Sequence, residues 1–418
     1  MIFEPELETM PPERLRTLQS ERLRDVVARV KELVPWYRDR LAGIEVDSLD
    51  DLPKLPFTRK SDLRDHYPFG LFAVPMRSIV RIHASSGTTG KPTVMGYTAG
   101  DVDLFARVNA RSLAMAGGGP DLILHNAYGY GLFTGGLGLH YGGERLGMTV
   151  VPVSGGMTER QLLLIQDFRP DLICCTPSYA LTLAQQLAER GLSPQEISLR
   201  YACLGAEPWT EGVRAEVDAG LGIRSTNIYG LSEIIGPGVS NECLEERSGS
   251  HVNEDHFYPE IVDPESGEPV AEGQEGVLVF TTLTKEALPL VRYWTGDICS
   301  LSSEQCSCGR TLRRMSLIKG RTDDMLIIRG VNIYPSQIEE VIPRVPGLTT
   351  NYRLVVTREG SLDELRVEVE GSGDGDTELA RLVKETTGCS VLVSVVPPGS
   401  VPRSEGGKLQ RVHDLRRL

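Results

Sequence analysis

Residues 148–175 read MTVVPVSGGMTERQLLLIQDFRPDLICC, and this stretch decides the fold. Its first part, residues 148–153, is an apolar run that predicts a strand. Residues 158–168 predict a helix, with Thr158 as a candidate cap and Pro170 just beyond the end. Residues 171–175 predict a second strand. Two strands joined by a helix predict a βαβ unit with parallel strands.

The same alternation continues on both sides of this unit. Residues 122–124 and 201–204 predict further strands, and residues 178–190 predict a helix that stops at Gly191. Another strand is predicted at residues 276–282. The predicted fold class is therefore α/β, with a large N-terminal domain of several subdomains around a mostly parallel sheet.

The two ends of the chain differ from this central pattern. Leu and Val recur at helical intervals up to about Leu41, which predicts helices there. The tail forms a small α+β unit with predicted strands at 325–328, 352–357, 365–369 and 391–396 and helices at 335–345 and 378–384. We therefore expect two domains, residues 1–320 and residues 321–418.

Composition excludes several classes of protein. The chain has 418 residues, 40% of them hydrophobic, which is too long for one ordinary core. Its net charge of −13 argues against a surface for nucleic acid or for an anionic membrane. It does not argue against ATP or CoA, because a small anion needs only a local pocket of N–H groups and cations.

The apolar runs, the first residues and the cysteines of the sequence predict where in the cell the protein is located. No apolar run approaches the ~18–20 residues that span a bilayer, and the first residues carry acids where a signal peptide needs basic and apolar groups. The eight cysteines are sparse, and Cys174 and Cys175 lie in an apolar run as buried thiols would. A reducing, cytoplasmic location is expected.

The octet SSGTTGKP at residues 85–92 predicts a phosphate-binding loop. Its two glycines allow a tight turn that presents N–H groups to an anion, and its hydroxyls and lysine can contact phosphate oxygens. It is not a Walker A loop, which needs four residues between the glycines and Ser or Thr after the Lys, where Pro92 stands here. The loop residues are Ser85, Ser86, Gly87, Thr88, Thr89, Gly90 and Lys91.

Five further motifs follow the octet. They are Gly205-Ala206-Glu207-Pro208, Tyr229-Gly230-Leu231-Ser232-Glu233, Thr295-Gly296-Asp297, Gly320-Arg321-Thr322-Asp323-Asp324 and Gly406-Gly407-Lys408. With the octet, they resemble the motifs of the adenylate-forming ligases, the acyl-CoA synthetase superfamily, in that family's order. Singly several are weak signals, but together they span residues 85–408.

The resemblance implies a role for each motif. Gly205, Ala206, Glu207, Pro208, Tyr229, Gly230, Ser232, Asp297 and Arg321 would join the loop in binding ATP or AMP. Tyr229 would stack on adenine, Glu233 would hold Mg²⁺, and Asp297 would accept from the ribose hydroxyls. Lys408 would bridge the acyl carboxylate and the α-phosphate. The C-terminal domain would be mobile and rotate about Asp323, between an adenylation and a thioesterification arrangement.

Within the superfamily the resemblance narrows to phenylacetate-CoA ligases. It rests on residues 125–136, 205–209, 254–257 and 325–334. It implies ATP, CoA and Mg²⁺ as cofactors or co-substrates, an aryl acid as substrate, and a homodimer. An apolar acyl pocket would be lined by Tyr128, Phe133, Gly135, Gly205, Ala206, Ile235, Gly236 and Pro237. Trp294, where a basic residue is expected, and Tyr334, where Phe is expected, depart from the pattern.

Cys243, His251, Cys306 and Cys308 make a Cys-x₇-His pair and a Cys-x-Cys pair. Cys₃His is a standard structural zinc set, so these four residues predict a zinc site. Four unconnected residues are the alternative, because Cys-x-Cys is less typical than Cys-x-x-Cys. His256 is an alternative nitrogen ligand.

Three other functions compete with this one. The adenylate could pass to a carrier protein or a deazaflavin cofactor in place of CoA. A noncatalytic nucleotide-binding or zinc-organised scaffold is disfavoured because Lys408, Glu233, Asp297 and Arg321 are all present. A P-loop kinase or ATPase is excluded by the loop spacing.

Overall fold

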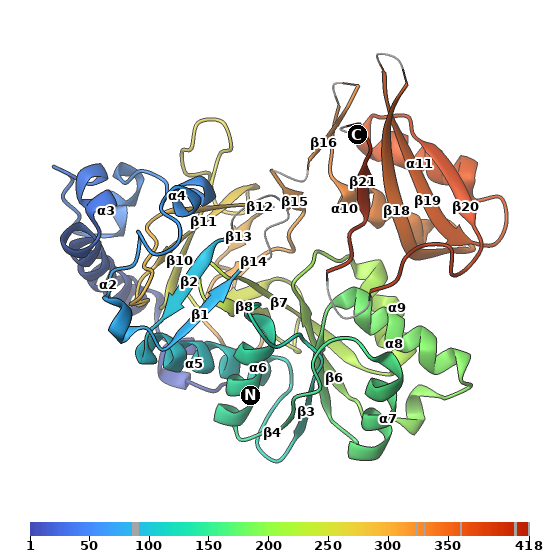
Figure 1. The fold of residues 1–418 in the computed structure, drawn as a ribbon, viewed down its shortest axis with the longest axis horizontal. Coiled ribbons are helices and arrows are strands. Elements are labelled where there is room, and N and C mark those ends of the chain that lie inside the picture. Colours follow the sequence, from blue (N-terminus) through green and yellow to red (C-terminus); the bar gives the residue numbers. More distant parts are fainter. Residues whose placement is uncertain (86–91, 323–324, 330, 360–361, 405–407, 417–418) are drawn as a thin grey trace. The chain divides into compact units, whose positions relative to one another are not determined.

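The computed structural model describes the chain apart from residues 86–91, 323–324, 330, 360–361, 405–407 and 417–418 (Figure 1). It folds into two compact units. Unit 1 comprises Met1–Cys175, Ile197–Ala206 and Arg224–Leu317. Unit 2 comprises Thr176–Glu196, Glu207–Ile223 and Ile318–Leu418, so it joins two internal segments to the C-terminal part.

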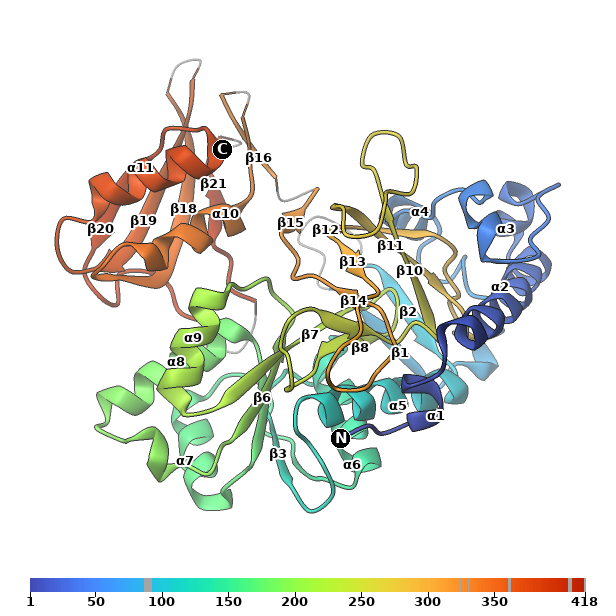
Figure 2. The same cartoon turned by 180° about the vertical axis from the view of Figure 1, so that it is seen from behind.

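Unit 1 contains a nine-stranded sheet in the order β13-β14-β9-β8-β7-β6-β5-β3-β4 (Figures 1 and 2). Its strands are β3 Ile123–Asn126, β4 Thr149–Val151, β5 Leu172–Cys175, β6 Tyr201–Gly205, β7 Arg224–Leu231, β8 Gly236–Glu242, β9 Ser250–Val252, β13 Leu301–Ser302 and β14 Arg314–Met315. The run from β4 to β7 is parallel, and the run from β7 to β13 is antiparallel. The α/β class is confirmed, and the strand pairing changes from parallel to antiparallel at β7.

The sequence predicts one of the crossover helices of unit 1 but not another. Helix α7, Thr158–Phe168, has the predicted bounds, although its N-cap is Met157 with φ 55° rather than Thr158. Helix α6, Gly135–Leu146, is glycine-rich and was not predicted. It packs against α5, Ala99–Met115, so closely that a Cβ on Gly138 would lie 2.4 Å from the Phe105 ring.

A second, antiparallel sheet in unit 1 carries part of the site. Strands β10 Phe257–Val262, β11 Gly276–Thr282 and β12 Tyr293–Cys299 pair in sequence order. Trp294 on β12 packs with Phe57, Val262, Val277 and Val279 in a small apolar cluster. A hairpin of β1 Arg81–Ala84 and β2 Val94–Tyr97 precedes α5.

The N-terminal region is helical, as predicted. It contains α1 Pro5–Glu8, α2 Pro12–Leu33, α3 Pro35–Arg40 and α4 Lys60–Asp65. The four-residue α1 is tied to a distant loop, because Arg310 Nε donates to Glu8 Oε2 at 2.6 Å across 302 positions of sequence. Arg310 Nη2 also donates to the Met1 carbonyl at 2.7 Å.

Unit 2 has its own sheet and core. The sheet order is β20-β19-β18-β21, with strands β18 Leu348–Glu359, β19 Leu362–Gly371, β20 Leu392–Val396 and β21 Val412–Asp414. Its other elements are α8 Pro177–Glu189, α9 Glu211–Leu221, β15 Gly320–Arg321, β16 Leu326–Ile328, β17 Val331–Ile333, α10 Pro335–Val341 and α11 Asp376–Thr387. Ile338, Tyr352, Val367 and Leu379 lie in its apolar core.

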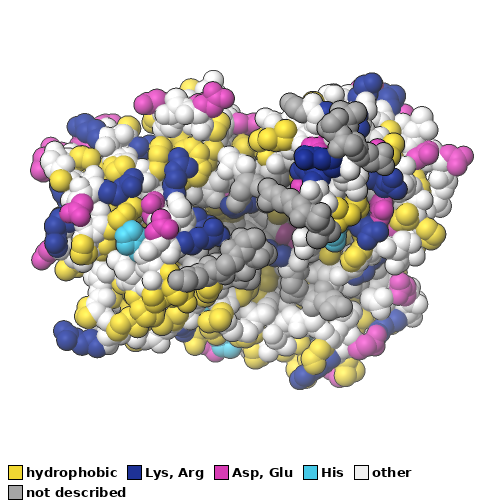
Figure 3. All heavy atoms as spheres, turned by 45° about the horizontal axis from the view of Figure 1, so that its top comes forward, with side chains coloured by type: hydrophobic (Ala, Val, Ile, Leu, Met, Phe, Trp, Pro, Cys, Tyr) yellow, Lys and Arg dark blue, Asp and Glu magenta, His cyan; other side chains and the backbone are white. Residues whose placement is uncertain are grey.

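The distribution of surface charges and the burial of the cysteines fit what the composition of the chain predicts. Acidic and basic side chains are interspersed over the face shown in Figure 3. Cys174 and Cys175 are fully buried, as predicted. Among the described residues, no helix combines the length and the apolar character that crossing a bilayer requires.

Candidate active site

The carboxyl end of β7 brings two of the predicted motifs together. Tyr229 on β7 donates from its hydroxyl to Asp297 Oδ2 on β12 at 2.6 Å. Asp297 is buried, and its own N–H donates to Thr295 Oγ1 at 3.0 Å. Gly230 allows this turn, because a Cβ there would lie 1.9 Å from the Gly236 carbonyl oxygen. The position matches the rule that ligands bind beyond the carboxyl ends of strands where a sheet changes its connection pattern.

Glu233 lies in the turn between β7 and β8 with 5% of its surface exposed. Its Oε1 is 3.4 Å from Lys60 Nζ at the start of α4. Its backbone carbonyl accepts from Lys285 Nζ at 2.9 Å. The Glu233 carboxylate thus lies beside one half-exposed cation, and its backbone carbonyl is held by one buried cation. Neither lysine was predicted to belong to the site.

Lys285 is the more unusual of the two lysines. It is buried, lies 5.4 Å from the centre of the Tyr97 ring, and has its pKa lowered to about 8 by burial, against the attraction of Asp101 and Glu233. The Tyr97 hydroxyl donates to the Ile235 carbonyl at 2.8 Å. The Glu233 turn is therefore fixed on both sides by buried side chains.

A composition signal could have identified these lysines. The chain has eight lysines among 44 basic residues, so arginine is the usual basic residue. A position that keeps lysine in such a chain suggests a need for a compact point charge. Lys60, Lys91, Lys285 and Lys408 are half of the eight.

The predicted acyl-pocket residues have different environments. Tyr128 is buried in an apolar cluster with Leu124, Cys174 and Cys203, and burial raises its pKa well above the ordinary value. Ile235 is fully buried, whereas Phe133 is 37% exposed. A Cβ on Gly135 would lie 2.5 Å from the Phe133 ring.

The two remaining glycines and their neighbours are close-packed. A Cβ on Gly236 would lie 2.7 Å from Thr134, whose hydroxyl is 3.3 Å from the Ser232 hydroxyl. In the turn after β6, a Cβ on Gly205 would lie 2.1 Å from the Ile228 carbonyl oxygen, and Ala206 has φ 74°. Pro237 pairs with Gly230 across β7 and β8.

Several predicted residues lie outside the described residues, namely Ser86, Gly87, Thr88, Thr89, Gly90, Lys91, Asp323, Gly406 and Gly407. Ser85 is described. Its N–H donates to the Thr93 carbonyl at 2.9 Å, and its Oγ accepts from the Thr93 N–H at 3.2 Å. Residues 85 and 93 are therefore paired on either side of the predicted phosphate loop.

Unit 2 carries the remaining site residues. Arg321 is half-buried on β15, and Gly320 lies against the Tyr334 ring. Lys408 is exposed. Glu207 accepts from the Ser178 N–H at 2.6 Å through Oε1 and from the Leu409 N–H at 3.2 Å through Oε2, and burial raises its pKa. Pro208, next to it, is exposed.

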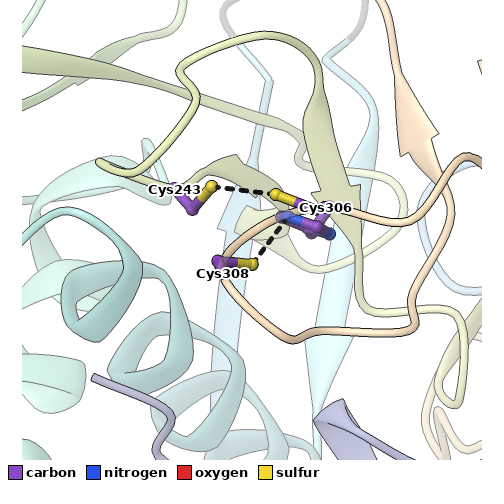
Figure 4. Close-up of side chains that lie close together, drawn as sticks. Cys243, Cys306 and Cys308 are labelled. Atoms are coloured by element: carbon purple, nitrogen blue, oxygen red, sulfur yellow. Dashed lines mark hydrogen bonds between the residues drawn. The ribbon is translucent and has the colours of Figure 1, made fainter.

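The four predicted metal ligands come together in unit 1 (Figure 4). Their ligand atoms all lie within 4.8 Å of one another. The two closest pairs are Cys243 Sγ to Cys306 Sγ at 3.5 Å and Cys308 Sγ to His251 Nε2 at 3.4 Å. His251 Nδ1 faces the Leu312 carbonyl at 3.1 Å, which leaves Nε2 toward the sulfurs. Three sulfurs and one nitrogen this close together form a candidate metal site.

The alternative ligand His256 was a wrong choice. It lies outside this group of four, with Nδ1 at 2.8 Å from the Thr284 hydroxyl and Nε2 at 3.2 Å from Asp255 Oδ2. Asp255 is held in turn by buried Arg111, with Nη1 to Oδ1 at 2.8 Å. His256 therefore belongs to a buried ionic network.

Comparison with known proteins gives one consistent family. Residues 36–283 match the family described as AMP-binding enzyme, and residues 330–416 match the AMP-binding enzyme C-terminal domain. The chain is 62% identical to the phenylacetate-coenzyme A ligase of Thermus thermophilus over the whole of both chains. It is 52% identical to that of Escherichia coli, with 99% of this chain and 97% of the relative covered.

A solved structure agrees with these relatives. The 2-hydroxyisobutyryl-CoA ligase in its postadenylation state, bound to an acyl-adenylate, is 30% identical and has a TM-score of 0.92. The match covers 100% of this chain and 93% of that chain.

Proposed function

Because the chain belongs to the AMP-binding enzyme family, and within it to the phenylacetate-CoA ligases, we propose that it converts phenylacetate, ATP and CoA into phenylacetyl-CoA, AMP and pyrophosphate. It is an AMP-forming acid–thiol ligase. The observation that carries the proposal is the hydrogen bond from Tyr229, on the strand that leads into the Glu233 turn, to Asp297, in a chain 62% identical to such a ligase.

The first half-reaction makes a leaving group. A carboxylate does not react with a thiol, because oxide would have to leave. An oxygen of the acyl carboxylate attacks the α-phosphate, the bond to the pyrophosphate oxygen breaks, and pyrophosphate departs. The Asp297 carboxylate would accept from the ribose hydroxyls, and the Tyr229 ring, held by its hydroxyl, would pack on adenine.

Charge on the phosphates is met by cations and N–H groups. We assign Lys408 to the α-phosphate and the acyl carboxylate, and Ser85–Lys91 to the other phosphates. Glu233 is a fitting oxygen ligand for Mg²⁺, which would neutralise phosphate charge when bound. Lys60, 3.4 Å from Glu233 Oε1, keeps that carboxylate paired until a cation competes for the carboxylate or a phosphate competes for the lysine.

The second half-reaction transfers the acyl group to sulfur. The CoA thiolate attacks the acyl carbon, the bond from that carbon to the phosphate oxygen breaks, and AMP leaves. A thiol of pKa about 8.5 is partly ionised near neutral pH, so a dedicated base is not required. We propose that Asp323 is the pivot that withdraws Lys408 between the two steps, with residues 1–320 and 321–418 as the moving parts.

A pyrophosphate-release assay across aryl and alkyl acids, with and without CoA, tests the proposal. Phenylacetate should give sustained release only with CoA present, together with AMP. A burst of about one pyrophosphate per chain that CoA does not relieve would instead favour a carrier protein or a deazaflavin as acceptor.

We also propose that Cys243, His251, Cys306 and Cys308 hold a structural zinc ion. The observation is the convergence of three sulfurs and His251 Nε2 within 4.8 Å, with Nδ1 of that ring engaged by a carbonyl as in zinc-bound histidines. Metal analysis of the purified protein should find about one zinc per chain. Cys306→Ser should lower the zinc content and the melting temperature, whereas Cys389→Ser, outside the cluster, should leave the zinc content unchanged. Equal zinc content in Cys306→Ser and wild type would contradict this site.

Two further proposals concern assembly and location. A homodimer and a cytoplasmic location are expected from the family resemblance and from the free cysteines. Light scattering of the purified protein and fractionation of cells that produce it would test them.

A further inference from the structure

We propose that Glu207 is a positioning residue for the adenylation half-reaction, in which its carboxylate anchors the main chain that carries Lys408. The inference rests on the proposed function, and it changes the role that the family resemblance implied for Glu207, which was nucleotide binding. Both ends of the contact lie in unit 2.

The geometry of Glu207 is that of an anchor. The turn after β6 passes through Ala206 at φ 74° and delivers the Glu207 side chain to two backbone donors. Oε1 accepts from the N–H of Ser178 at 2.6 Å, and Oε2 accepts from the N–H of Leu409 at 3.2 Å. Each carboxylate oxygen therefore has a backbone partner, and the second partner is the residue directly after Lys408.

The contact with the Ser178 N–H fixes the Glu207 carboxylate at the N-terminus of α8. Ser178 lies in the first turn of α8, where N–H groups lack partners within the helix and the helix dipole favours a negative charge. Thr176 caps the same turn by accepting from the Tyr179 N–H at 3.3 Å. Glu207 is thus fixed at one oxygen by α8, and its other oxygen is available to hold the Lys408 segment.

A second tie holds the segment ahead of Lys408. Arg403 Nε donates to Gln185 Oε1 on α8 at 3.0 Å, and Arg403 Nη2 donates to Glu370 Oε2 on β19 at 2.6 Å. After Lys408, Arg411 lies 3.5 Å from Glu339 Oε2 and 4.6 Å from the centre of the Tyr352 ring. The described contacts on the two sides of Lys408 are thus those of Arg403 and those of Leu409 and Arg411, while the Lys408 side chain itself is exposed.

In this arrangement the Lys408 side chain is free to reach a phosphate, while neighbouring contacts hold its main chain. A lysine ammonium on a long side chain can act at a phosphate only if its main chain stays in place. A hydrogen bond to a charged group shifts an equilibrium by roughly tenfold or more, which is enough to hold a segment and weak enough to release it. Glu207 would therefore favour the arrangement in which Lys408 serves adenylation.

The test compares two half-reactions in four proteins: wild type, Glu207→Gln, Gln185→Ala and the control Glu216→Ala. Glu216 also joins unit 2 internally, by accepting from Thr350 Oγ1 at 2.5 Å, but far along the sequence from Lys408. Adenylation is measured as single-turnover pyrophosphate release without CoA. Thioester formation is measured from supplied phenylacetyl-adenylate with CoA.

Glu207→Gln should lower the adenylation rate at least about tenfold relative to the thioester rate, with the ATP KM changed less than about twofold. Gln185→Ala should act in the same direction and more weakly, and Glu216→Ala should keep the wild-type ratio. In a Lys408→Ala background, Glu207→Gln should cause no further loss, because both changes remove one function.

Three results would overturn the anchor. They are a raised ATP KM at an unchanged adenylation rate, an equal loss in both half-reactions, and a loss that adds to that of Lys408→Ala. Hydrogen exchange of the peptide containing Leu409, in protein without ligands, should be faster in Glu207→Gln than in wild type, and unchanged exchange would also overturn it. That measurement needs no substrate, so it tests the anchor even if wild type fails to adenylate phenylacetate.

Discussion

Two regions of the molecule carry the predicted chemistry in opposite ways. In unit 1, Tyr229 on β7 is hydrogen-bonded to Asp297 on β12, and the Glu233 turn after β7 is held by buried Lys285. In unit 2, Lys408 is exposed on a segment held mainly through main-chain and flanking contacts. The groups proposed to hold the nucleotide through both half-reactions lie on strands of unit 1 or in the turn between two of them. The group proposed for one half-reaction sits where local release costs little.

The largest effect should come from removing the ammonium group of Lys408. Lys408→Ala is expected to slow adenylation by at least about 10³-fold, because a cation aimed at the reacting phosphate is lost. Thioester formation from supplied phenylacetyl-adenylate should fall far less. The same change at Lys384, exposed on α11, is the matched control. A similar fall in both half-reactions of folded Lys408→Ala would remove the contrast between the two regions.

A smaller effect is expected from neutralising the carboxylate of Glu233. Glu233→Gln should slow adenylation roughly 10²-fold and raise the Mg²⁺ concentration needed for half of the maximal rate, since an oxygen ligand loses its charge. Glu286→Gln is the control, because Glu286 accepts from Thr98 Oγ1 at 2.6 Å in the loop that also carries Lys285. An unchanged Mg²⁺ requirement in Glu233→Gln would place the metal elsewhere.

The smallest of the three concerns stability. Burial lowers the pKa of Lys285 to about 8 from 10.5, so between these pH values the unfolded chain binds more protons than the folded one. Wild-type stability therefore rises with pH, relative to Lys285→Met, by about 2 kcal/mol between pH 7.5 and pH 10. Urea denaturation at pH 7.5 and pH 10 would measure it. Parallel pH curves for the two proteins would mean that the amine under Glu233 is not held in a buried, charged state at neutral pH.

The fold was predicted best where local patterns and tertiary packing agree. Strand β11 and helix α7 have the predicted bounds, because apolar periodicity and helix-ending residues coincide there. Helix α6 was missed because its glycines oppose helix propensity and serve a close approach to α5. That approach depends on side chains 30 or more positions away, such as Phe105, which no local pattern contains.

The site shows the same division. Tyr229 and Asp297 could be named from motifs, and the metal ligands from residue types, because the chemistry restricts which residues can serve. Lys60 and Lys285 could not, since their meaning arises only when α4 and the loop after β11 meet the Glu233 turn. Trp294, which departs from the family pattern, packs with Phe57, and no local pattern in the sequence predicts that contact.

The tie between Glu8 and Arg310 has a consequence for biosynthesis. A ribosome completes the first helical turn long before it reaches the partner that lies 302 positions later. A four-residue helix is not stable alone, and Glu8 must stay without its Arg310 partner through most of translation. Unit 1 can be completed only after its last segment, which carries Arg310, has emerged from the ribosome.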